Sequence, residues 1–218
     1  SYTFDLNTTI DAFQSSVAAA GTGTYVNATL DALFTSFIST ANLASLTWNI
    51  VAAESLGPRR LLDTYTTLPA TRITADLVRS TITGVQSFVG AVNTGITAQG
   101  NGNSAVFAAG TPGYANNATG VRFGTNNGGG LNFNNSGTVA NNSYANGLGF
   151  LRIDAGASGV AASTYTPYVD EGFAVRAYFD SAAGKVVIAA VPEPETYAML
   201  LAGLGLMGAI ARRRRKQG

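Results

Sequence analysis

The chain has 218 residues, of which 46% are apolar and only 11% are charged. It contains no cysteine and no histidine, which excludes disulfides, metal sites that use either residue, and Ser–His or Cys–His nucleophile systems. Residues 1–191 hold 8 basic and 10 acidic residues, a net charge of −2, so they lack the positive surface of a nucleic-acid-binding protein. We therefore expect an apolar core with a polar, uncharged exterior, no cofactor, no metal and no nucleic-acid partner.

The first 70 residues combine strand and helix patterns. Apolar and polar residues alternate over 1–6, which predicts a strand. Apolar residues then recur every three or four positions and predict an amphipathic helix over about 28–42. Alternation returns at 45–53, a Gly-Pro turn follows, and 60–66 is typical of the returning strand. This region is thus expected to mix strands with one helix.

The strongest helical pattern covers residues 71–98. Its apolar residues fall every three or four positions, and polar residues such as Arg72, Asp76 and Arg79 occupy the positions between them. This spacing predicts one long amphipathic helix whose apolar stripe packs on a sheet.

Residues 100–149 differ sharply in composition, with twelve Asn, twelve Gly and a single charge, Arg122. Aromatic residues recur at intervals, and Asn-Gly pairs, which suit tight hairpin turns, lie among them. Two interpretations compete: short strands that are each anchored by one aromatic residue, or one long loop. We prefer the short strands.

Strand patterns return at 150–154, 173–179 and 185–191, with a hairpin turn expected at 180–184. The predicted fold class is α+β: mainly an antiparallel β-sheet or sandwich, two amphipathic helices in the N-terminal half, and a C-terminal hydrophobic helix. We expect two regions, a β-rich body over 1–191 and a tail over 192–218.

The tail has three parts in a fixed order. Pro192, Glu193 and Pro194 form a stiff spacer, because each proline lacks a backbone donor. A run of 15 residues without charge follows, about 22 Å long as a helix, which is marginal for crossing a membrane. Five basic residues then favour retention on the cytoplasmic side. The residues expected in the membrane helix are Tyr197, Leu200, Leu201, Leu204, Leu206 and Ile210, and those of the cytoplasmic anchor are Arg212, Arg213, Arg214, Arg215 and Lys216.

This tripartite tail resembles the PEP-CTERM sorting signal, along the whole of VPEPETYAMLLAGLGLMGAIARRRRK. The resemblance implies that a membrane protease, exosortase, recognises Pro192, Glu193 and Pro194. It also implies a Gram-negative host, export to the cell surface or matrix with transient or retained membrane anchoring, and often a role in exopolysaccharide or biofilm. With Ser1 as the first residue, we expect a signal peptide to have been removed.

The body offers little for catalysis. Its acids near the last strands are Asp154, Asp170, Glu171 and Asp180, and a carboxylate pair for glycoside hydrolysis or a Ca²⁺ site are alternatives to solvated surface charge. Tyrosines in an Asn-rich surface are candidates for stacking on sugar rings, although we prefer core or hairpin packing as their role. These tyrosines are Tyr114 and Tyr144, with Tyr165 and Tyr168 as further candidates.

Three functions compete. The first is a non-enzymatic structural or adhesive surface protein that self-assembles into an oligomer or filament, with the strand at residues 2–6 added to a neighbour's sheet. The second is a carbohydrate-binding matrix protein with a polysaccharide partner. The third is a hydrolase that uses Asp154 and Asp170. We rank them in this order.

Overall fold

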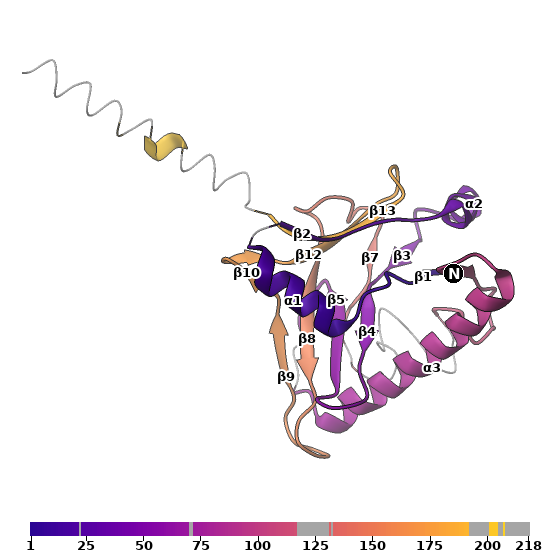
Figure 1. Ribbon diagram of the computed structural model, residues 1–218, viewed down its shortest axis with the longest axis horizontal. Helices are drawn as coiled ribbons and strands as arrows, with labels where there is room; N and C mark the ends of the chain where they lie inside the picture. The colour runs from indigo at the N-terminus through magenta and orange to yellow at the C-terminus, as the bar shows by residue number, and fades with distance from the viewer. Residues whose placement is uncertain are drawn as a thin grey trace, which may run out of the picture.

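The computed structural model describes residues 1–21, 23–69, 72–116, 131, 133–191, 201–204 and 207. Its centre is a seven-stranded antiparallel sheet in the order β2-β13-β12-β8-β5-β4, with β9 also pairing with β8 (Figure 1). Its strands are β2 (Gly23–Thr29), β4 (Val51–Ala53), β5 (Arg60–Tyr65), β8 (Leu148–Asp154), β9 (Thr164–Pro167), β12 (Arg176–Asp180) and β13 (Lys185–Ala190).

Three two-stranded sheets and three helices complete the body. The small sheets pair β1 with β6, β3 with β7 and β10 with β11. Their strands are β1 (Tyr2–Phe4), β6 (Ser104–Val106), β3 (Thr47–Trp48), β7 (Gly137–Thr138), β10 (Val169–Asp170) and β11 (Phe173–Ala174). The helices are α1 (Ile10–Ala20), α2 (Ala32–Thr40) and α3 (Ala75–Gln99).

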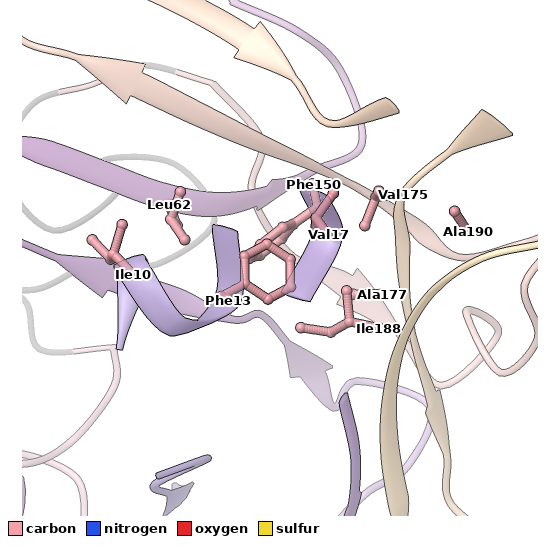
Figure 2. Close-up of a cluster of buried hydrophobic side chains, with 9 residues drawn as sticks. All are labelled: Ile10, Phe13, Val17, Leu62, Phe150, Val175, Ala177, Ile188 and Ala190. Atoms are coloured by element: carbon pink, nitrogen blue, oxygen red, sulfur yellow. The ribbon is translucent and has the colours of Figure 1, made fainter. Parts of the chain in front are cut away.

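Helix α1 covers one face of the main sheet. Thr9 caps it, its hydroxyl oxygen accepting from the Ala12 amide at 3.1 Å. Ile10, Phe13 and Val17, spaced by three and four residues, then point to the sheet (Figure 2). The buried cluster on this face consists of Ile10, Phe13, Val17, Leu62, Phe150, Val175, Ala177, Ile188 and Ala190.

Helix α3 covers the opposite face of the main sheet. In Figure 1 it lies below β4 and β5. Leu61 and Leu62 are neighbours in β5, yet Leu61 packs with α3 and Leu62 with α1, because successive strand residues point to opposite faces. The cluster on the α3 face consists of Leu61, Ile73, Val78, Ile82, Val85, Leu131, Phe133, Leu151 and Ile153. Burial on both faces explains why four consecutive residues of β5 are inaccessible.

The two helices and most strands predicted from the sequence are confirmed, including the long helix, which begins at Ala75. Of the alternatives, sheet or sandwich, the structure has one main sheet with helices on both faces. Helix α1, β2 and β9 had not been predicted.

The Asn/Gly-rich segment is only partly described. Its residues 117–130 and 132 lie outside the described part, while β6, β7 and the start of β8 lie within it. These elements agree with the preferred interpretation of short strands at the described positions.

Candidate functional site

The tail follows β13, a strand of the main sheet that is paired on both sides. β13 pairs along its length with β12 on one side and β2 on the other, and its last register partner is Gly23, opposite Ala190. Residues 186–190 are buried, whereas Val191 is exposed. The chain therefore changes from a buried strand at Ala190 to an exposed residue at Val191.

A small polar cluster lies beside this attachment. The Tyr25 hydroxyl donates to Asp170 Oδ2 in the β10–β11 hairpin and contacts the Gly21 carbonyl oxygen at 3.3 Å, just after α1. Burial, and then the hydrogen bond to Asp170, raise the pKa of Tyr25. Glu171 and Gly172 form the tip of the hairpin with φ of 48° and 86°. This cluster ties α1, β2 and the hairpin together at the end of the sheet where β13 stops.

The predicted sorting and anchoring residues lie mostly outside the described residues. This applies to Pro192, Glu193, Pro194, Tyr197, Leu200, Leu206, Ile210, Arg212, Arg213, Arg214, Arg215 and Lys216. Leu201 and Leu204 are described, are helical and have exposed side chains. Among the described residues, no helix is both long and apolar enough to cross a membrane.

The tyrosines proposed for sugar stacking have other contacts. The Tyr144 hydroxyl donates to the Ala174 carbonyl oxygen at 2.6 Å, and the Arg176 guanidinium lies 5.9 Å from its ring centroid. Tyr168 packs between Phe13 and Phe150 in the α1 cluster. Tyr114 is half-buried, and Tyr165 is the more exposed, at 37%. These four rings do not form one platform, because Tyr144 and Tyr168 are engaged within the fold.

The acidic residues proposed for catalysis are dispersed. Asp154 forms an ion pair with Arg152 at 2.9 Å, and Asp180 accepts from the Ala183 amide in its hairpin turn. Asp154 lies opposite Thr164 in the register of β8 and β9. Asp170 follows Thr164 by six residues of extended chain, so Asp154 and Asp170 are roughly 20 Å apart. Glycosidase pairs lie within about 10 Å. Within the described ranges, no group of three or more acids is placed to hold a metal ion.

One buried polar contact had not been predicted. Asp63 in β5 is fully buried and accepts from the Asn135 side-chain amide at 3.2 and 3.3 Å. The neighbouring Thr64 hydroxyl donates to the Asn135 carbonyl oxygen at 2.6 Å. These bonds fix the Asn/Gly-rich segment to the sheet at Asn135. An acid between Leu62 and Thr64 in the strand predicted at 60–66 was the signal in the sequence.

Comparison with known proteins identifies the tail alone. Residues 190–216 match the family model of the PEP-CTERM protein-sorting motif, which confirms the resemblance seen in the sequence. No curated protein and no solved structure matches the chain. The match begins at Ala190, the last residue of β13.

Proposed function

We propose that this chain is an exported structural protein of the bacterial cell surface or matrix. The proposal starts from the PEP-CTERM sorting motif at residues 190–216. The motif implies export and processing by exosortase at a membrane. One observation supports the assignment of function to the body: the motif begins where β13 ends, so removal of the tail leaves every pairing of the sheet in place. The body is then a complete fold after processing.

Intact mass tests the processing step. The full chain would be expressed in a Gram-negative host with an exosortase and in the same host without it. We expect a product cut within residues 190–216 only in the first host, and the full 22.3 kDa in the second. Glu193→Ala should leave the chain uncut, while Glu195→Ala, which removes the same charge just after the Pro192, Glu193, Pro194 triplet, should still be cut. Full-length protein from both hosts would contradict the proposal.

We propose a different strand for self-assembly from the one expected. β1 is paired with β6 along all three residues, so its edge is occupied on that side. β2 is the outermost strand of the main sheet, contains no charge and no proline, and exposes Thr24, Asn27 and Thr29. Edge strands without such protection favour pairing with another chain, although the bulge in β2 opposite Ile188 and Ala189 restricts it. Copies that share one membrane before processing would meet at high effective concentration. The assembly edge in this proposal is therefore β2.

Asn27→Lys tests this edge, because a lysine on an edge strand opposes strand addition. Sedimentation of the processed protein should show loss of oligomers or filaments in this variant, while Ser16→Lys on the exposed side of α1 should assemble normally. Unchanged assembly of Asn27→Lys would exclude β2 as the interface.

The body has no catalytic role in this proposal, which is supported by the dispersion of Asp154, Asp170 and Asp180. The alternative, a carbohydrate-binding matrix protein in a biofilm, now has Tyr114 and Tyr165 as its candidates, because Tyr144 is engaged with Arg176. Binding of the host's exopolysaccharide that falls in Tyr165→Ala would favour this alternative, and an absence of binding would remove it.

A further inference from the structure

Two basic residues of the body, Arg59 and Arg79, lie beside the loop that follows β8. The β4–β5 turn holds Arg59, and α3 holds Arg79 near its start. Both line an open hollow of about 410 Å³, whose other walls are Gly57, Pro58, Ala155, Gly156 and Ala157. No acidic residue lines this hollow, so two guanidinium groups set its charge.

Arg79 is held in place with its charge incompletely neutralised. Its Nη2 donates to the carbonyl oxygens of Gly156 and Ala157 at 3.1 and 2.9 Å. The nearest carboxylate is that of Asp76, 3.7 Å from Nη1 and therefore beyond hydrogen-bond range, with a largely exposed side chain. Nε is buried and has no hydrogen-bond partner within the described residues. Among the described residues, the Nη1 group of Arg79 is thus a cationic donor without a hydrogen-bond acceptor.

Arg59 supplies the second cation. Its backbone has φ of 52°, and its carbonyl oxygen accepts from the Ala155 amide at 3.2 Å, which fixes the turn against the end of β8. The side chain is exposed and makes no ion pair with any described residue. By contrast, the adjacent Arg60 contacts both Asp11 and Glu54. Arg59 and Arg60 therefore differ in function: Arg60 ties α1 to the sheet, and Arg59 remains available.

The wall between the two arginines is preformed. A Cβ on Gly156 would lie 2.5 Å from the Ala162 carbonyl oxygen, so this loop is closed tightly upon itself. The first amides of α3 are already bonded, Ala75 to Ala161 and Asp76 to Gly159. The helix N-terminus thus offers no free donors, and binding in the hollow must come from the guanidinium groups.

We propose that this hollow binds a small oxyanion, a carboxylate or a phosphate, between Arg59 and Arg79. Guanidinium groups present planar donors that match these anions, and two positive charges without a lining acid give the net attraction. The shared chemistry is an oxyanion on a larger molecule, either an acidic sugar or a phosphorylated group.

Amide chemical shifts of the full chain in a neutral detergent would test this, with sodium acetate and inorganic phosphate as probes and sodium chloride at equal ionic strength as the reference. We expect saturable shifts confined to the amides of residues 57, 59 and 155–157 with one or both probes, beyond the effect of chloride. Acetate alone would identify carboxylate as the ligand chemistry, and phosphate alone would identify phosphate.

Arg59→Asn provides the specific variant, because asparagine accepts positive φ and removes the charge. It should weaken binding about tenfold or more, whereas Lys185→Gln, at the distant β12–β13 hairpin, should not. Arg79→Lys retains the charge but loses the planar donors and should also weaken binding. Shifts that do not saturate, or equal binding by wild type and Arg59→Asn, would overturn the proposal.

Discussion

The two faces of the main sheet pack against their helices through different kinds of side chain. On the α1 face, a helix of 11 residues is held by aromatic contacts, with Phe13 at 5.1 Å from Phe150 and 5.4 Å from Tyr168 between ring centroids. On the α3 face, a helix of 25 residues is held by aliphatic side chains such as Ile82 and Val85. A helix of 11 residues is marginal on its own, so α1 depends on tertiary contacts more than α3 does.

The difference teaches where stability is concentrated. One ring, Phe13, connects α1 to three others, because it also lies 6.2 Å from Tyr25. On the α3 face, the buried residues of the helix are spread along a longer stripe. We therefore expect single substitutions to act more strongly on the α1 face.

Phe13→Ala should have the largest effect. It removes a side chain that is 3% exposed, and truncation of a buried Phe costs about 3–5 kcal/mol. Urea unfolding of this variant should be compared with Ile82→Ala on the other face. A smaller loss for Phe13→Ala than for Ile82→Ala would contradict the asymmetry.

Asp63→Ala should come next, at about 1–3 kcal/mol or more, since it leaves the buried Asn135 amide without this acceptor. Asp63→Asn retains the shape and should cost less. Near-equal unfolding midpoints of wild type and Asp63→Ala would show that the contact contributes nothing to stability.

Removing the N-cap of each helix should have a smaller effect on stability and should show whether α1 opens more readily than α3. Thr9→Ala and Thr74→Ala each remove one N-cap bond, worth about 1 kcal/mol. Hydrogen exchange should show more opening of α1 than of α3, because the same loss is spread over fewer residues. Equal protection of the two helices would argue that α1 is as independent as α3.

The smallest effect concerns alkaline pH. Burial raises the pKa of Tyr168 and Tyr25 on the α1 face and of Tyr65 on the α3 face, above the ordinary value of 10.0. Above that pH the unfolded chain loses these protons first, so stability should fall as pH rises beyond it. Urea midpoints between about pH 8 and about pH 11 should fall less in Tyr168→Phe than in wild type. Identical slopes would assign the loss to other groups.

The long helix α3 could be predicted from the sequence, whereas α1 was not. The stripe of α3 is long enough for its 3.6-residue period to be recognised without other information. α1 shows the same period only through Ile10, Phe13 and Val17, and its other apolar residues are alanines. The cap at Thr9 and this triplet together would have found it.

The candidate sites divide in the same way. The sorting motif is local in sequence and was found directly. The Asp63–Asn135 contact spans 72 residues, and the hollow at Arg59 and Arg79 depends on β8 bringing Gly156 between them. Such sites follow from strand register, which composition does not specify.

The end of β13 at Ala190 also limits how far the folded body can lie from the apolar run of the tail. Six residues, 191–196, separate the sheet from the first residue of the apolar run, Tyr197. Fully extended, they reach about 20 Å at most. In the proposed function that run lies in a membrane before processing, so the folded body would be held near the bilayer surface on a very short tether. A protease whose active site lies at that surface could reach this tether, and the cut would allow the protein to move away.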